Sequence, residues 1–406
     1  MEPLIILAMI CEFPKDFLWG AATAAYQIEG GILNNDWAEK YPAGLACDHY
    51  HRYEEDFSLL KKLNLNAYRM SVEWARLEPE PGRFNQDEFA HYRKMLESLK
   101  AQKVAVMVTL HHFTLPDWAA KIGGFGNPEM IGHFVRFAEK VFLELGDMVD
   151  LWITVNEPMI YSYSIVPLLN GWQKESLEGV PLDKYPEAIK TVAASFKVMN
   201  NLVRTHNASY RKIKSLSSGR AVIGIAHNMF YFEPERRNNF FDRLSAQLQH
   251  YLWNIYFLDR IRRNLDYIGV NYYIHRLVRF PFPSKSESKT TDMGWEIYPE
   301  GIYRVIMGVT KYRLPIYVTE NGVADDKDLL RRDFIHNHLL WVHRAIKDGA
   351  DVCGYYYWSL TDNFEWAHGT KMRFGLVNID YLTQERKVRL SGYYYADIAK
   401  NNCLEA

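Results

Sequence analysis

The chain has 406 residues, of which 48% are hydrophobic, enough to fill the core of a large domain. Its 48 basic and 49 acidic residues nearly cancel, so nothing in the charge points to a nucleic-acid or acidic-membrane partner. The four cysteines (Cys11, Cys47, Cys353 and Cys403) lack the paired spacing of a disulfide framework or a metal site, and we expect reduced thiols.

The first apolar run, residues 4–11, is too short to cross a bilayer. It has no basic stretch before it and no small-residue cleavage site after it, so it is not predicted to be a signal peptide. No other stretch is predicted to span a membrane, and the protein is expected to be cytoplasmic. Residues 1–12 are interpreted as an N-terminal extension and 13–406 as one domain.

Eight short, mostly apolar runs are predicted to be β-strands, at 18–23, 67–71, 104–110, 151–156, 221–226, 267–271, 316–319 and 355–358. Unbroken apolar runs are typical of parallel strands that are covered on both faces. Helical patterns follow at 56–63, 86–102, 128–145, 186–214, 240–263, 299–312, 328–348 and 390–400, and Asn85 is a predicted N-cap. Eight strand–helix units predict a single α/β domain, a (β/α)8 TIM barrel with its active site at the C-terminal ends of the strands.

Two polar tracts are predicted to be long loops on the face of the barrel where active sites form. Residues 171–185 follow the fourth strand, and residues 283–292, rich in Ser, Lys and Glu, follow the sixth.

Polar residues gather after the strands, where a barrel brings all strand ends to one mouth. They are Gln27 and Glu29, Arg69, His111 and His112, Asn156 and Glu157, Asn271 and Tyr273, Glu320, and then Trp358, Glu365 and Trp366. Adjacent strand residues point to opposite faces, so only one of the two neighbouring histidines is expected in the pocket, and no metal site is predicted. The histidines at 336, 338 and 343 are expected to be solvated on a surface helix.

Glu157 and Glu320 each follow an apolar, β-branched run and precede a turn marked by Pro158 or Gly322. Two carboxylates that face one bond are what hydrolysis of a glycoside requires. Either glutamate alone could merely close a turn or pair with an arginine, but that alternative weakens when both occur among the polar residues above.

Several ordered motifs resemble glycoside hydrolase family 1, the retaining β-glycosidases, over about residues 13–399. The stretch 13–30 (FPKDFLWGAATAAYQIEG) is similar to the N-terminal signature of the family. Residues 156–158 (NEP) and 319–322 (TENG) resemble its acid/base and nucleophile motifs, and 362–366 (DNFEW) with 373–376 (RFGL) its C-terminal sugar-binding segment. The stretches 111–116 (HHFTLP) and 269–273 (GVNYY) look most like the archaeal branch.

The resemblance implies a role for each matching residue. Glu320 would be the nucleophile and Glu157 the general acid and base, with a pKa raised by the nearby charge of Glu320. Arg69 and Tyr273 would hold the nucleophile, and Asn156 the sugar 2-hydroxyl. Gln27, His112 and Glu365 would bind the 3-, 4- and 6-hydroxyls. Trp358 would form the platform under the sugar ring and Trp366 a side wall. Asn271 and Phe374 would supply further sugar contacts. No cofactor and no metal are implied.

Glu365 favours a free 6-hydroxyl, because a carboxylate there would repel the phosphate of a 6-phosphoglycoside. The expected substrates are small-molecule β-glycosides with a terminal β-D-glucosyl or β-D-galactosyl group. Phe113, the short stretch 258–267 and the region 171–173 depart from the usual pattern of the family and leave the leaving-group preference open. The resemblance and the aromatic content of 15% favour alkyl or aryl leaving groups. A transglycosylase with the same residues remains an alternative, and a silent sugar-binding barrel is disfavoured because both glutamates are present.

Overall fold

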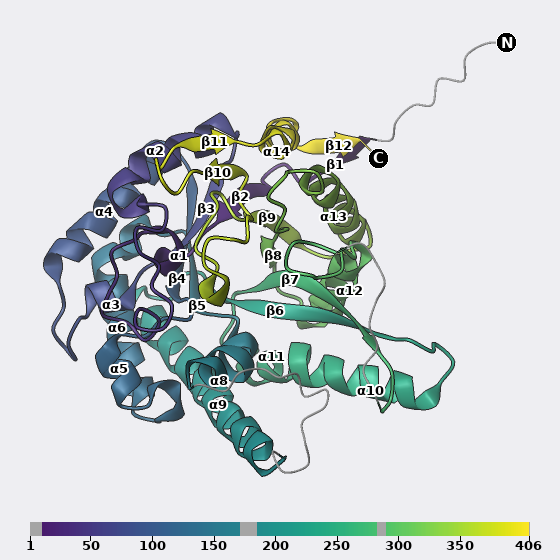
Figure 1. The fold of residues 1–406 in the computed structure, drawn as a ribbon, viewed down its shortest axis with the longest axis horizontal. Helices are drawn as coiled ribbons and strands as arrows, with labels where there is room; N and C mark the ends of the chain where they lie inside the picture. The colour runs from purple at the N-terminus through teal and green to yellow at the C-terminus, as the bar shows by residue number, and fades with distance from the viewer. Residues whose placement is uncertain (1–9, 171–184, 282–289, 406) are drawn as a thin grey trace.

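The computed structural model describes residues 10–170, 185–281 and 290–405. Eight strands form a closed barrel in which neighbours are parallel and the last pairs with the first (Figure 1). They are β2 (Leu18–Ala22), β3 (Ala67–Ser71), β4 (Ala105–His111), β5 (Leu151–Asn156), β6 (Ile223–Pro234), β7 (Tyr267–Val278), β8 (Ile316–Asn321) and β9 (Val352–Trp358). The predicted TIM barrel is confirmed.

The main helices follow the strands in the predicted order and surround the barrel (Figure 1). They are α2 (His49–Lys62), α4 (Gln86–Ala101), α6 (Met130–Leu145), α9 (Tyr185–Leu216), α10 (Phe240–His250), α11 (Tyr256–Ile261), α12 (Glu300–Val309), α13 (Arg331–Lys347) and α14 (Leu390–Asn401). The predicted cap of α4 is confirmed, because the Asn85 side chain accepts a hydrogen bond from the backbone N–H of Asp87 at 3.1 Å.

Shorter elements lie in the loops between these. They are α1 (Ala25–Ile28), α3 (Trp74–Leu77), α5 (Asp117–Lys121), α7 (Pro158–Ile160) and α8 (Val166–Leu169), with π-helices at Tyr161–Ile165 and Tyr251–Ile255. The second π-helix divides the predicted helix 240–263 into α10 and α11. Further 3-10 turns lie at Gly124–Gly126, Gly146–Met148, Thr310–Tyr312 and Trp366–His368.

The inside of the barrel is filled with side chains, which leaves the strand ends as the place for a pocket. Ala67, Met107, Ile153, Tyr267 and Tyr356 from five of the strands belong to one buried cluster. The packing is tight enough to require glycine on β6: a Cβ at position 224 would lie 2.5 Å from the ring that β7 contributes.

Two strands run far past their predicted C-terminal ends. β6 continues from the predicted end at 226 to 234, and β7 from 271 to 278. The two extensions pair with each other from His227↔Val270 to Pro234↔Val278, so each supplies backbone partners that the other needs beyond the barrel.

The chain ends add a small antiparallel pair outside the barrel. β1 (Ile10–Glu12) pairs with β12 (Cys403–Glu405), so residues 10–12 of the predicted extension are part of the fold. A second pair joins β10 (Val377–Ile379) to β11 (Arg386–Val388). The predicted loops 171–185 and 283–292 lie mostly outside the described residues.

The prediction of solvated histidines on α13 is wrong for two of the three. His338 is 1% exposed, its Nδ1 lies 2.8 Å from the Phe334 carbonyl oxygen, and burial lowers its pKa to about 3. His343 is buried against the ring of Phe13. His338 packs against the ring of Tyr272 on β7, so it lies on the side of α13 that faces the barrel.

All four cysteines are free, as expected. Over the described part of the chain, no helix combines the length and apolar character needed to cross a membrane.

Candidate active site

A cavity of about 280 Å³ lies at the C-terminal ends of the barrel strands and brings together most of the predicted site residues. Its lining includes Gln27, His112, Asn156, Glu157, Tyr273, Glu320, Trp358, Glu365, Trp366 and Phe374. The other two predicted residues, Arg69 and Asn271, are fully buried directly behind this lining and contact it through hydrogen bonds.

Glu320 lies near the end of β8 and is held at both carboxylate oxygens. Oε1 accepts a hydrogen bond from Arg69 Nη1 at 2.6 Å, and Oε2 accepts one from the Tyr273 hydroxyl at 2.9 Å. Burial raises the pKa of Glu320, and the Arg69 charge with these hydrogen bonds opposes that rise. One carboxylate oxygen therefore meets a buried positive charge, and the other meets a hydroxyl donor from the cavity lining.

Arg69 lies on β3, is fully buried, and donates hydrogen bonds to acceptors on several sides. Nη1 also donates to the carbonyl of Thr319 at 3.1 Å, Nη2 donates to Asn156 Oδ1 at 2.7 Å, and Nε donates to Thr109 Oγ1 at 3.2 Å. Because a buried guanidinium needs its donors satisfied, this set holds the charge in one place beside Glu320.

Glu157 follows β5 with a left-handed backbone (φ 46°), which turns its side chain into the mouth of the barrel. Its Oε1 accepts hydrogen bonds from Asn271 Nδ2 at 2.8 Å and from Asn228 Nδ2 at 3.1 Å. Burial, followed by the negative charge of Glu320, raises the pKa of Glu157 to about 8. The sequence-based expectation named only the charge, but burial is the larger cause.

Glu365 also lines the cavity and carries a raised pKa, of about 7, caused mainly by burial. Its Oε2 accepts hydrogen bonds from Asn363 Nδ2 at 2.9 Å and from Gln27 Nε2 at 3.2 Å. Two predicted sugar-binding residues, Gln27 and Glu365, are thus in direct contact.

Three rings form one wall of the cavity. The ring of His112 is nearly parallel to that of Trp358 at 5.7 Å and to that of Trp366 at 6.2 Å between centroids. Burial and the Arg69 charge lower the pKa of His112 well below its ordinary value, so this imidazole is neutral. His111 points away and packs against Phe125 and Tyr161, as expected for its neighbour on a strand.

Sequence reasoning missed several lining residues. Asn228, which contacts Glu157, follows the fifth predicted strand, the one strand to which no polar residue was assigned. The cavity is also lined by Trp37 and by an apolar set outside the motifs: Ile160, Ile165, Leu168, Ile274, Met293 and Trp295. Glu29 is not part of the lining, because it pairs instead with Arg76 at 2.8 Å.

The donor set suits proton transfer and nucleophilic attack on a polar ligand. Within the described ranges, no three metal-ligating side chains come close enough to hold an ion.

Known proteins are similar to this chain over nearly its whole length. The model of the family described as Glycosyl hydrolase family 1 matches residues 9–272 and 258–404. The 1,4-beta-D-glucan glucohydrolase of Thermotoga neapolitana is 33% identical over 97% of this chain and 99% of its own length. The beta-galactosidase of Pyrococcus woesei is 30% identical over 96% and 97%.

Two solved structures are also similar. A beta-glycosidase from Pyrococcus horikoshii has a TM-score of 0.87 at 37% identity and covers 98% of this chain and 97% of that one. A beta-glucosidase from Thermotoga maritima in complex with glucoimidazole has a TM-score of 0.87 at 33% identity, over 97% and 100%. From its fold, its motifs and these matches, the chain belongs to glycosyl hydrolase family 1 and is a glycosidase.

Proposed function

We propose that the protein is a retaining exo-β-glycosidase that removes terminal β-D-glucosyl or β-D-galactosyl groups by double displacement. Glu320 attacks the anomeric carbon and forms a covalent glycosyl-enzyme, while Glu157 donates its proton to the leaving oxygen. Glu157 then takes a proton from water, which attacks the same carbon and releases the sugar with the β-configuration retained.

The observation that carries the proposal is the unequal surroundings of the two glutamates. Glu320 faces the Arg69 charge and the Tyr273 hydroxyl, which suits a group that must be ionised to attack. Glu157 receives only two amide donors, and its pKa of about 8 keeps it protonated at neutral pH. Once Glu320 is consumed in the intermediate, its charge no longer raises the pKa of Glu157, which can then act as a base.

The polar side of the cavity supports recognition of one terminal sugar. Gln27, His112 and Glu365 supply hydrogen-bonding groups, Asn156 lies beside the nucleophile, and Trp358 provides an apolar platform. Hydroxyl groups of a pyranose require such donors and acceptors, and its apolar face packs on aromatic rings. The acidic group at position 365 favours an unphosphorylated sugar.

An apolar leaving group is supported by the rest of the lining. Ile160, Ile165, Leu168, Met293 and Trp295 offer carbon surface at the cavity instead of paired polar groups. A solved Thermotoga maritima beta-glucosidase, similar to this chain at 33% identity, holds a ligand with an N-octyl group. Alkyl and aryl glycosides are therefore the expected substrates.

The test is turnover of an aryl β-glucoside, an aryl β-galactoside, octyl β-glucoside and cellobiose, with the first-formed anomer followed by NMR. The wild type should release the β-anomer and should have a higher kcat/KM on the octyl glucoside than on cellobiose. Glu320→Gln should abolish turnover, whereas Glu29→Gln, which changes a buried glutamate outside the cavity, should keep it. Release of the α-anomer would reject retention, and full activity of Glu320→Gln would reject the assigned nucleophile.

A further inference from the structure

Six lining residues lie in one stretch of chain that begins with the last residue of β9: Trp358, Glu365, Trp366, Ala367, His368 and Phe374. This stretch contains the 3-10 turn Trp366–His368, and backbone hydrogen bonds such as Asp362 N–H to the Val377 carbonyl, at 2.9 Å, join its two ends. Asp362 lies near its middle. Its side chain is 0% exposed and does not belong to the cavity lining.

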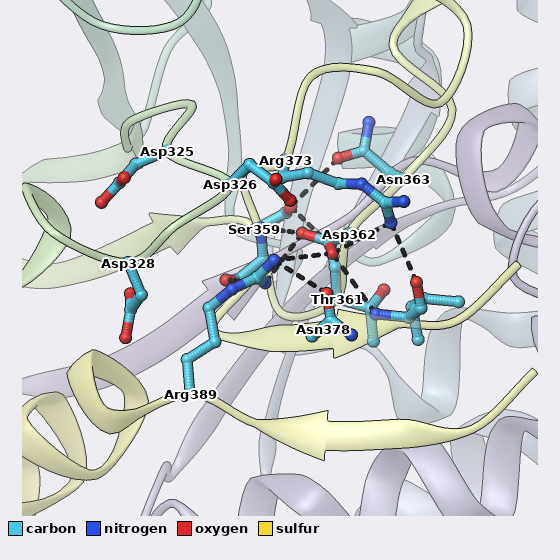
Figure 2. A network of polar contacts seen from close by, with 12 residues as sticks. Asp325, Asp326, Asp328, Ser359, Thr361, Asp362, Asn363, Arg373, Asn378 and Arg389 are labelled. Carbon is cyan, nitrogen blue, oxygen red and sulfur yellow. Dashed lines mark hydrogen bonds and ion pairs between the residues drawn. The ribbon is translucent and has the colours of Figure 1, made fainter.

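The carboxylate of Asp362 is the centre of a dense polar network (Figure 2). Arg389 binds it with two parallel hydrogen bonds, Nη1 to Oδ1 and Nη2 to Oδ2, both at 2.9 Å. Arg373 Nη1 approaches Oδ2 at 3.3 Å, and the backbone N–H groups of Gly375 and Ile379 donate at 2.9 and 3.3 Å. A forked pair of this kind fixes both distance and orientation.

These contacts join the two arms of the stretch. One arm, 358–366, contains Asp362. The other arm, 373–379, contains Phe374 and contacts the Asp362 carboxylate through the N–H group of Gly375. Arg389, the residue before α14, donates to the carbonyl of Gly375 at 2.8 Å as well. The arms are pressed together, because a Cβ at position 375 would lie 2.2 Å from the backbone nitrogen of Asp362.

The network reaches Glu365 through the next residue along the chain. Asn363 Nδ2 donates to Glu365 Oε2 at 2.9 Å, and Asn363 Oδ1 accepts from the Ser359 hydroxyl at 3.1 Å. Since Asp362 and Asn363 are adjacent, holding the carboxylate of the first holds the amide of the second. Figure 2 shows both side chains in this close-up, with Arg389 and Arg373 directed toward Asp362.

We propose that Asp362 is a positioning residue of the sugar pocket: its pair with Arg389 sets Glu365 relative to Phe374 and so determines selectivity for glycosides with a C6 hydroxymethyl group. The inference rests on the proposed function, in which Glu365 binds the sugar. A buried ion pair adds little net stability compared with apolar packing, so a structural contribution alone does not account for a five-contact carboxylate at this position.

The test compares Asp362→Asn with the wild type on an aryl β-glucoside and on the matching aryl β-xyloside, which lacks the hydroxymethyl group. The variant should lose about tenfold or more in kcat/KM on the glucoside and change less than about threefold on the xyloside. An unchanged glucoside/xyloside ratio would overturn the proposal.

Asp242→Asn is the matched control. Asp242 is also 0% exposed, receives two hydrogen bonds of 2.8 Å from the fork of Arg236 and one of 3.0 Å from the N–H of Phe280, and lies on α10, outside the cavity lining. Asp242→Asn should lower Tm and leave the glucoside/xyloside ratio of kcat/KM unchanged. If Asp362→Asn does not fold, the charge-balanced Asp362→Asn/Arg389→Gln variant takes its place, with the same expected change in ratio.

Inhibitor binding tells a failure of this inference apart from a failure of the proposed function. The wild type should bind deoxynojirimycin more tightly than the analogous iminoxylitol without the hydroxymethyl group, and Asp362→Asn should reduce that preference about tenfold. Loss of the preference without any wild-type turnover would support the positioning role and reject the hydrolase. A preference that Asp362→Asn leaves intact would reject the positioning role whatever the turnover.

Discussion

Arg69 and Glu320 form an ion pair of 2.6 Å in which the two side chains are 0% and 5% exposed. The arginine binds four different acceptors with its three nitrogens, so its planar fork and not only its charge is used. A lysine could keep the charge near Glu320 but could not reach Thr109, Asn156 and Thr319 together.

Arg69→Lys should therefore lower kcat by about 10²-fold, since each buried hydrogen bond to a charged group that is left unmade costs about 1.5–3 kcal/mol. Steady-state kinetics on an aryl glycoside measure the loss. Arg386→Lys is the control, because the Arg386 side chain is also buried, 1% exposed, but binds Asp56, Gln384 and Cys47, which lie outside the cavity lining. A kcat equal to that of the wild type in Arg69→Lys would show that charge alone is sufficient.

Glu320→Gln should lower the pKa of Glu157 from its value of about 8. The charge of Glu320 is the second cause of the raised pKa, after burial, and the glutamine removes it while keeping the shape of the side chain. Burial remains, so the pKa should stay above the ordinary value for a glutamate.

The shift can be measured by NMR titration of ¹³C-labelled glutamate carboxyl groups, with the resonance of Glu157 identified by its loss in Glu157→Gln. Glu365→Gln is the control, since the charge of Glu365 is not a main cause of the shift at Glu157. An unchanged or higher pKa of Glu157 in Glu320→Gln would contradict the coupling of the two carboxyl groups.

The residues that could be predicted from the sequence are those placed by the barrel itself. Glu157 and Glu320 end apolar strands, and a closed parallel barrel brings all such ends to one mouth, however far apart they lie in the chain. The motif residues Gln27, Glu365 and Trp366 followed from the family resemblance. Their mutual contacts did not, because they depend on loop paths that a strand pattern does not specify.

Asn228 could not be placed because the predicted end of its strand, at 226, fell before it. The extension of β6 to Pro234 is stabilised by pairing with β7, a long-range contact that no local pattern reports. His338 was misplaced for a similar reason: a helix face is buried or exposed according to what packs on it. The family resemblance included Asp362 in a motif but did not predict its contacts, because its partner Arg389 lies 27 residues further along the chain.

Asn228→Leu should move the alkaline limb of the pH–kcat/KM profile to higher pH. Glu157 must be protonated to donate to the leaving group, so activity is expected to fall as the pH rises through its pKa of about 8. The hydrogen bond from Asn228 stabilises the ionised form and lowers that pKa, and leucine removes the bond while keeping the site buried.

The measurement uses an alkyl glycoside, whose poor leaving group depends on proton donation. Ser164→Ala changes another residue of the lining, one that is not among the hydrogen-bond donors to Glu157, and should leave the limb in place. A limb that moves to lower pH in Asn228→Leu would contradict the assignment of Glu157 as the titrating acid.

Glu365→Gln should make the free energy of unfolding less dependent on pH. The folded-state pKa of Glu365, about 7, lies above the ordinary value of 4.5, so the folded protein binds more protons than the unfolded chain between these values. The stability that this group contributes is therefore present below about pH 4.5 and is lost as the pH rises to about 7. Glutamine resembles the protonated acid at every pH.

Relative to the wild type, Glu365→Gln should gain about 2 kcal/mol in the free energy of unfolding between pH 4.5 and pH 8, allowing for partial solvent screening of a side chain that is only partly buried. Urea unfolding at the two pH values measures this difference. Glu80→Gln, a change at a glutamate whose side chain is 63% exposed, should give nearly the same difference from the wild type at both. A Glu365→Gln variant that instead loses stability relative to the wild type on going to pH 8 would mean that the folded protein favours the ionised carboxylate, and Glu365, beside Asn363 and Gln27, would then be a charged acceptor throughout catalysis.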